Sequence, residues 1–188
     1  MIAQELKVTY VAFLRGINVG GHHKVPMGEL KNEFENLGFE KVTTILNSGN
    51  IIFDAKGDKF ENIEKRIFVH LENYFGFSIP IILRKAETLL ELFYKHPFRE
   101  IAISKNTRLY ISFLKSDENL ALELPWTSPD NSYRILEYKA KSILSVLDLS
   151  ISKTPKAMEI LEKSFGKELT TRNWNTIEKI ERKLQAGR

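Results

Sequence analysis

The sequence predicts a mixed α+β fold made of two successive β-α-β-β-α-β modules, with one further helix at the C-terminal end. Short apolar runs of strand length alternate with longer segments whose apolar residues recur at helical spacing. The first run, 8–14, is almost entirely apolar, as expected for a strand inside a sheet. The same order of strands and helices then recurs, less clearly, in the second half of the chain.

The first half starts with strand 8–14 and a long loop rich in glycine and basic residues. A helix is expected from about Pro26, with Gly38 after its end, and its apolar stripe consists of Met27, Leu30, Phe34 and Leu37. Strands 42–47 and 50–53 then form a hairpin. The next helix ends before Gly76, and its stripe consists of Phe60, Ile63, Ile67 and Leu71.

A last strand, 79–83, completes the first module. Pro80 within it indicates the edge of a sheet, because proline has no N–H to donate to a neighbouring strand. The module therefore matches the ferredoxin-like plait, in which the first and third strands are central. We expect the strand order 4-1-3-2, with both helices on one face.

In the second half, strands are expected at 107–114, 132–138 and 142–149, and a short strand at 168–170. The remaining expected elements are a short helix at 117–122, a helix at 155–165 that starts with Pro155, and a final helix with the stripe Trp174, Ile177, Ile180 and Leu184. The predicted domains are a plait at 1–84, a helical linker at 85–106, and a second plait with its appended helix at 107–188.

Composition narrows the class of protein. The 188 residues are 43% hydrophobic and 28% charged, as in ordinary globular chains, and no apolar run is long enough for a membrane span. The chain has no cysteine and no secretory signal, so a cytoplasmic location is expected. The net charge is +4, and residues 150–188 alone carry 9 basic and 5 acidic side chains. This basic end attracts anions, or simply forms a solvated helix surface.

Two loops are expected to meet at one edge of the first module, because the loop after the first strand and the 47–50 turn leave the sheet on the same side. Their polar side chains suit a phosphate or carboxylate, together with the free N–H groups of the helix that follows. These candidate ligand-binding residues are Arg15, Asn18, Lys24, Asn47, Ser48 and Asn50. The alternative is that the same side chains only hold the loops in shape.

A second candidate edge lies in the second half. Lys153 and Arg172 each come just before a helix, so we expect them to face each other and to need an anion between them. Asn173 is included in this site. The alternative is that Asn173 or Asn175 caps the last helix and that Arg172 pairs with a nearby glutamate.

Several motifs resemble a bacterial family known as domain-of-unknown-function family 1697. They are Arg15–Gly20, Val25–Met27, Asn47–Asn50, Ser152–Lys153 and Thr171–Thr176. The family often has glutamine where this chain has Asn47. The resemblance covers most of the chain and implies tandem ferredoxin-like domains. It supplies no substrate and no catalytic residue.

The leading functional prediction is noncatalytic binding of an anionic ligand, either a nucleotide or a nucleic-acid phosphate. An enzyme acting on a small phosphorylated or carboxylated substrate is the first alternative, although Ser48 lacks an evident base and the pocket lacks an evident acid. An assembly module that packs a sheet face on a second copy of the chain is the other. No cofactor is expected, and no metal, because the four histidines His22, His23, His70 and His96 do not form a ligand set.

Overall fold

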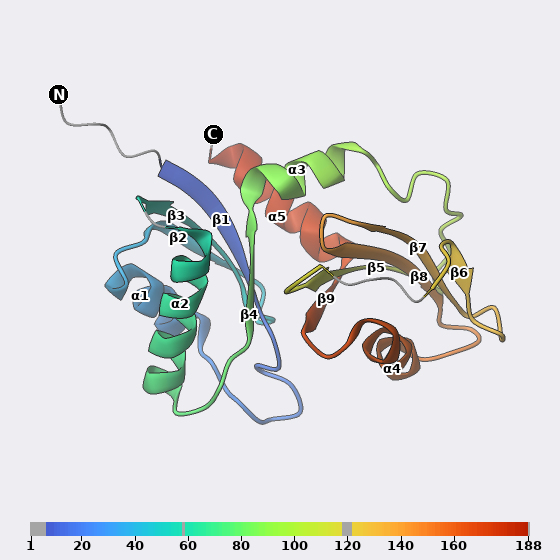
Figure 1. Cartoon of the computed structure of the whole chain (residues 1–188), viewed down its shortest axis with the longest axis horizontal. Coiled ribbons are helices and arrows are strands. Elements are labelled where there is room, and N and C mark those ends of the chain that lie inside the picture. The colour runs from blue at the N-terminus through green and yellow to red at the C-terminus, as the bar shows by residue number, and fades with distance from the viewer. Residues whose placement is uncertain (1–6, 58, 118–121, 188) are drawn as a thin grey trace. The chain divides into compact units, whose positions relative to one another are not determined.

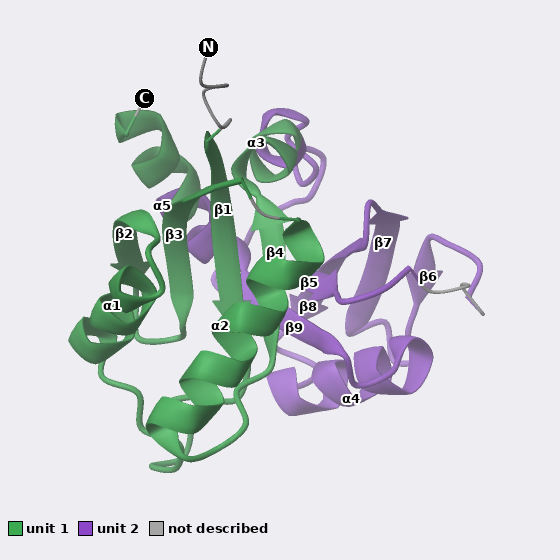
Figure 2. Cartoon of the chain, turned by 60° about the vertical axis from the view of Figure 1, so that its left-hand side comes forward, with its two compact units in different colours: residues 1–91, 180–188 green, residues 92–179 purple. Residues whose placement is uncertain are grey.

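The computed structural model describes residues 7–57, 59–117 and 122–187 (Figure 1). The chain divides into two compact units, one formed by residues 1–91 with 180–188 and the other by residues 92–179 (Figure 2). The described residues form five helices and two antiparallel sheets, so the mixed α+β class is confirmed. None of these helices has the length and apolar character needed to cross a membrane.

Unit 1 contains a four-stranded sheet whose order is β2-β3-β1-β4, the order predicted from the sequence. Its elements are β1 (Lys7–Leu14), α1 (Met27–Asn36), β2 (Glu40–Ile45), β3 (Asn50–Lys56), α2 (Phe60–Phe75) and β4 (Ile81–Lys85). Pro80 precedes β4 instead of lying within it, and its carbonyl accepts a hydrogen bond from the backbone N–H of Arg15 at 2.9 Å. Gly76 ends α2 in the left-handed conformation, with φ of 76°.

Helices α1 and α2 lie over the same face of the sheet of unit 1 (Figure 2). Tyr10 pairs with Phe53 in the register of β1 and β3, and both side chains belong to the core that this face shares with α1 and α2. Residues one position away, such as Thr9 and its partner Asp54, therefore lie on the opposite face. Tyr10, Ile51 and Phe53 are buried in this core. Their side chains are therefore not available on an open sheet face to stack against the bases of a nucleic acid.

Unit 2 contains a five-stranded sheet of order β6-β7-β8-β5-β9. The remaining elements of the chain are α3 (Ala86–Tyr94), β5 (Thr107–Leu114), β6 (Trp126–Thr127), β7 (Tyr133–Lys139), β8 (Ser142–Asp148), α4 (Thr154–Phe165), β9 (Leu169–Asn173) and α5 (Trp174–Ala186). The side chains of Ala157, Leu161 and Phe165 pack α4 against one face of this sheet, next to Tyr110 of β5.

The strands of the second half differ from the predicted ones in two places. A two-residue strand, β6, joins the edge of the sheet beside β7, and β9 extends to Asn173, beyond the predicted end at 170. The helix predicted at 117–122 falls mostly on residues 118–121, which lie outside the described residues. The boundaries between the compact units fall inside α3 and α5. The three-part domain assignment at 84 and 106 stays a prediction.

Candidate functional site

The first predicted edge exists as a contact between two loops. The side-chain Nδ2 of Asn18, in the loop after β1, donates to the carbonyl of Asn47 in the β2–β3 turn at 2.8 Å. Arg15 is partly buried, and its backbone N–H donates to the Pro80 carbonyl. Lys24, Asn47 and Ser48 are exposed, whereas Asn50 is fully buried. The contact between Asn18 and Asn47 joins the two loops as expected, and a shared ligand site for all six residues stays a prediction.

Asn18 is engaged within the loops. Its Nδ2 also donates to the carbonyl of Val25 at 3.0 Å, and its Oδ1 accepts from the Val25 N–H at 2.8 Å. Both amide hydrogens are thus used, and the backbone φ of 56° suits asparagine. Asn18 holds the long loop closed instead of presenting its amide to a ligand.

The side chains of the 47–50 turn also bond within the turn itself. The Asn50 side chain donates to the carbonyl of Ile45 at 2.8 Å and to the Ser48 hydroxyl at 3.0 Å. Gly49 has φ of 72°, and a Cβ there would lie 2.7 Å from Cδ1 of Ile17. Its carbonyl accepts from the Leu14 N–H at 2.8 Å. Only glycine fits this close approach, so the motif is explained by the packing of the turn.

The second predicted edge does not form as expected. Arg172 pairs with Ile111 in the register of β9 and β5, whereas the neighbouring Tyr110 faces α4. Arg172 therefore projects from the face opposite α4, and Lys153 directly precedes that helix. The predicted meeting of Lys153 and Arg172 is wrong, because the extension of β9 fixes which face each residue of that strand occupies.

Arg172 is instead part of the sheet interior. Its Nη1 donates to the Thr170 hydroxyl at 2.8 Å and to the Thr171 carbonyl at 2.9 Å, and burial lowers its pKa to about 10. Asn173 accepts from the Asn175 N–H at 3.1 Å, which is the helix-capping role of the alternative interpretation. Lys153 is exposed at the start of α4.

A cavity in unit 1 was not anticipated from the sequence. It has a volume of about 610 Å³ and adjoins the sheet face opposite α1 and α2, where Thr9 and Asp54 are paired across β1 and β3. Five lysines and three carboxylates line it, an excess of two positive charges. The lysines are Lys7, Lys31, Lys41, Lys85 and Lys183, and the carboxylates are Glu35, Asp54 and Glu87.

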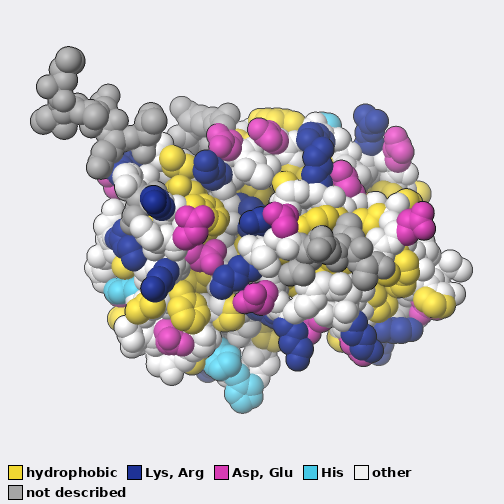
Figure 3. Space-filling view, in the orientation of Figure 1, with side chains coloured by type: hydrophobic (Ala, Val, Ile, Leu, Met, Phe, Trp, Pro, Cys, Tyr) yellow, Lys and Arg dark blue, Asp and Glu magenta, His cyan; other side chains and the backbone are white. Residues whose placement is uncertain are grey.

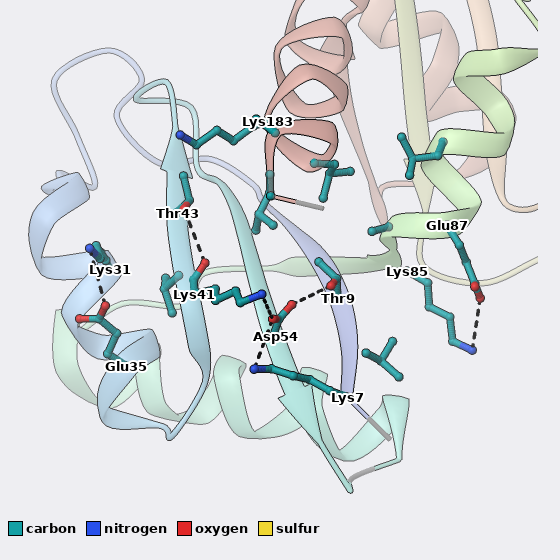
Figure 4. Close-up of a pocket in the computed structure, with 18 residues that line it drawn as sticks. Lys7, Thr9, Lys31, Glu35, Lys41, Thr43, Asp54, Lys85, Glu87 and Lys183 are labelled. Carbon is teal, nitrogen blue, oxygen red and sulfur yellow. Dashed lines mark hydrogen bonds and ion pairs between the residues drawn. The ribbon is translucent and has the colours of Figure 1, made fainter. Parts of the chain in front are cut away.

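Asp54 is the only carboxylate among these three that is buried, with its side chain 7% exposed. It accepts a hydrogen bond from the Thr9 hydroxyl at 2.6 Å. The ammonium groups of Lys7 and Lys41 approach the other carboxylate oxygen at 3.5 and 3.7 Å (Figure 4). One carboxylate is thus shared by two ammonium groups, which leaves positive charge available in the cavity.

An irregularity in β2 directs Lys41 into this cavity. Glu40 pairs with Asp54 and Thr43 with Ile52, so β2 has one more residue than β3 over the same stretch, the pattern of a β-bulge. Lys41 has φ of 50°, unusual for a residue with a long side chain. Without the bulge Lys41 would pair with Phe53, on the helix-covered face. The bulge instead brings its ammonium group to Asp54.

Glu40 reduces the charge at one end of the cavity. Its carboxylate accepts from Lys56 and Lys7, each at 2.6 Å, and these hydrogen bonds lower the pKa of Glu40 to about 2. The same contact raises the pKa of Lys7, so both groups stay charged near neutral pH. Lys183 makes no ion pair with any residue in the described ranges. Lys41 and Lys183 are therefore the cations least compensated by acidic side chains.

No metal centre accompanies the cavity within the part of the chain that the structure describes, where no three His, Cys, Asp or Glu side chains lie close enough to hold an ion. His23, from the histidine pair of the long loop, stacks on Phe77 with ring centres 4.5 Å apart. His70 contacts Glu33 at 2.7 Å between the two helices. These two histidines are thus explained by packing and pairing.

The family assignment rests on a match over about two thirds of the chain. The model of the family described as "Protein of unknown function (DUF1697)" matches residues 8–133. The chain belongs to this family. The resemblance noted from the sequence is confirmed for this range, which contains Thr9, Lys41 and Asp54. The motifs at 152–153 and 171–176 lie beyond it.

A solved structure supports the same conclusion for the fold. The chain is similar to the conserved bacterial protein SP0830 from Streptococcus pneumoniae, with 26% sequence identity and a TM-score of 0.75. The similarity covers 96% of this chain and 99% of that protein. No curated protein matches the chain. The similarity to SP0830 supports the kind of fold, and DUF1697 membership leaves the ligand to be inferred from the site.

Proposed function

We propose that the protein binds a small anionic ligand, carrying phosphate or carboxylate groups, in the lysine-lined cavity of unit 1. The observation that supports this most strongly is the weak compensation of Lys41, whose nearest carboxylate, Asp54 at 3.7 Å, also approaches Lys7 at 3.5 Å. Lys183 adds a further ammonium group without an ion pair among the described residues. An anion would complete this cluster by joining several cations at once.

The size and setting of the cavity favour a small molecule over a nucleic-acid strand. About 610 Å³ lies within the range of small-molecule sites, roughly 300–1,000 Å³. A nucleic-acid interface needs a continuous basic surface along the backbone. Figure 3 shows acidic and basic side chains interspersed over the visible face instead of a basic stripe. We therefore place the free phosphate-bearing molecule ahead of the nucleic acid.

The test compares two lysines of the same helix. Lys183→Gln removes an ammonium group that lines the cavity, and Lys179→Gln removes one from α5 that does not. Phosphate should stabilise the native chain as RT ln(1 + [L]/Kd), measured as thermal unfolding against phosphate with chloride at matched ionic strength. Losing one cation–anion contact worth about 1 kcal/mol weakens binding about fivefold.

The comparison of the two variants tests whether phosphate binds in this cavity. We expect the phosphate-specific stabilisation to shrink in Lys183→Gln and to persist in Lys179→Gln. Equal stabilisation by phosphate and chloride, or equal behaviour of the two variants, would contradict binding in this cavity.

Asp54 also supports a second candidate, an enzyme acting on a phosphorylated or carboxylated substrate. A buried carboxylate beside a threonine hydroxyl, inside a cationic cavity, is a titratable group placed where a general acid or base would act. A binding protein leaves the bound molecule unchanged, whereas an enzyme converts it to a product. No product resonance appears in the ³¹P spectrum of an added phosphate monoester if the protein only binds it. Conversion that is lost in Asp54→Asn, while binding persists, would establish the enzyme.

We also propose that unit 1 is a ferredoxin-like plait. Its support is the element order β-α-β-β-α-β, the strand order β2-β3-β1-β4, and the two helices on one face. Unit 2 also has an antiparallel sheet, with α4 packed on one face. It differs from unit 1 by the additional edge strand β6. In this arrangement the cavity of unit 1 adjoins the sheet face that such plaits leave free of their own helices.

A further inference from the structure

A second cavity, of about 500 Å³, lies wholly within unit 2. The segment that follows α3, the segment that leads into β5, and the start of α5 form its walls. Trp174 is the first residue of α5. Its ring stacks on Phe93 with centres 5.8 Å apart and 7° between planes, and Phe98 meets it edge-on at 5.0 Å. One wall of the cavity is therefore a rigid aromatic cluster.

The cavity is also cationic. Arg99, Lys105 and Arg108 line it, against a single lining carboxylate, Glu178. Arg99 contacts Glu100 at 3.6 Å, but both side chains are more than 70% exposed, so that pair neutralises little. Lys105 has no ion pair among the described residues. Three cationic side chains thus line this cavity with one carboxylate, an excess of two positive charges.

Arg108 is held in place by the backbone. Its Nη1 donates to the carbonyls of Lys105 and Thr107, at 2.9 and 3.0 Å. These contacts use one nitrogen of a guanidinium group that has five N–H donors. The same hydrogen bonds tie the position of Lys105 to that of Arg108, so the two cations belong to one ordered turn.

We propose that this cavity binds a small molecule that joins a flat aromatic ring to an anionic group, of which a nucleoside monophosphate is the simplest example. Phe93, Ile103 and Leu109 offer apolar lining for the ring, and Lys105 and Arg108 offer charge for the anion. Arginine planes and aromatic faces both pack well against bases. The exposed amide of Asn175 supplies a polar contact at the same wall. This site is separate from the lysine-lined cavity and does not depend on it.

The experiment uses the fluorescence of Trp174. The chain has two tryptophans, so Trp126→Phe leaves Trp174 as the only one, at the wall of the cavity. Adenosine monophosphate, adenosine and inorganic phosphate are titrated separately, and calorimetry on the unmodified chain repeats the measurement without the substitution. Saturable quenching by adenosine monophosphate, with weaker effects from adenosine and from phosphate, is the expected result.

Charge variants locate the site. Lys105→Gln should raise the Kd for adenosine monophosphate about fivefold or more, by removing a charge-assisted contact. Lys167→Gln removes an exposed lysine of unit 2 outside the cavity and should leave the Kd unchanged, as should Lys183→Gln. No saturable binding, equal binding of adenosine and its monophosphate, or equal Kd values for Lys105→Gln and Lys167→Gln would overturn the proposal.

Discussion

Gly49→Ala should destabilise unit 1 more than an equivalent change at Gly76. Both glycines have left-handed backbone angles, φ of 72° and 76°, so alanine costs each about 1–2 kcal/mol in backbone strain. At Gly76 nothing lies within 4 Å of the added Cβ. At Gly49 the Cβ would lie 2.7 Å from Ile17 Cδ1 and 2.8 Å from Leu14 Cβ.

Both contacts at Gly49 are with buried residues, so the structure must shift to relieve them. Ile17 is 3% exposed and Leu14 1% exposed. Overpacking in such surroundings costs about 1–3 kcal/mol beyond the backbone strain. The free energy of unfolding should therefore fall by about 2–5 kcal/mol in Gly49→Ala and by about 1–2 kcal/mol in Gly76→Ala.

Urea unfolding followed by far-UV circular dichroism measures both changes. Both tryptophans belong to unit 2, so fluorescence is the wrong probe for this comparison. Hydrogen exchange of the β3 amides reports on unit 1 directly. If the two variants lose equal stability, the turn is not tightly packed, and the structural interpretation of the 47–50 motif fails.

Two further predictions concern unit 2. The Asp130 carboxylate accepts hydrogen bonds from Lys156, Ser128 and Ser132, which lower its pKa. The ionised carboxylate therefore stabilises the folded chain above the ordinary aspartate pKa near 3.8, and this stabilisation is lost as the pH falls below that value. Asp130→Asn should make the stability of the chain depend less on pH in this acid range, as measured by thermal unfolding. An unchanged profile would contradict the assignment. Arg172→Ala should lower the free energy of unfolding by about 2–4 kcal/mol, because buried hydrogen bonds and packing are lost. The same variant should retain the phosphate-specific stabilisation, and loss of that stabilisation would restore Arg172 as a binding residue.

Sequence patterns predicted most of unit 1 because its elements differ clearly in period. The run 8–14 is a strand paired on both sides, and Gly76 ends a helix, both as expected. Unit 2 was less predictable, because a two-residue strand such as β6 has too few residues to show a period. Arg172 was misplaced because β9 runs three residues beyond the predicted end, so Arg172 is a strand residue fixed on one face of the sheet instead of a loop residue before the helix.

The cavity could not be found from the sequence for a similar reason. Lys41 reaches Asp54 only because β2 contains a bulge, and no local signal marks the inserted residue. Asp54 lies just beyond the predicted strand 50–53, but it belongs to β3 and is buried. Lys183 is distant in sequence from both. By contrast, the edge that topology did predict is formed by Asn18 and Asn50, whose side chains are engaged in closing the loops.

The most direct test of anion binding in unit 1 is an amide chemical-shift titration of the ¹⁵N-labelled chain with phosphate, at constant ionic strength. The ligand changes the field at the nearest amides, so the largest saturable shifts should come from Thr9, Lys41 and Thr43, which line the cavity. Shifts confined to the loop from Arg15 to Lys24, or shifts that chloride reproduces, would contradict the account.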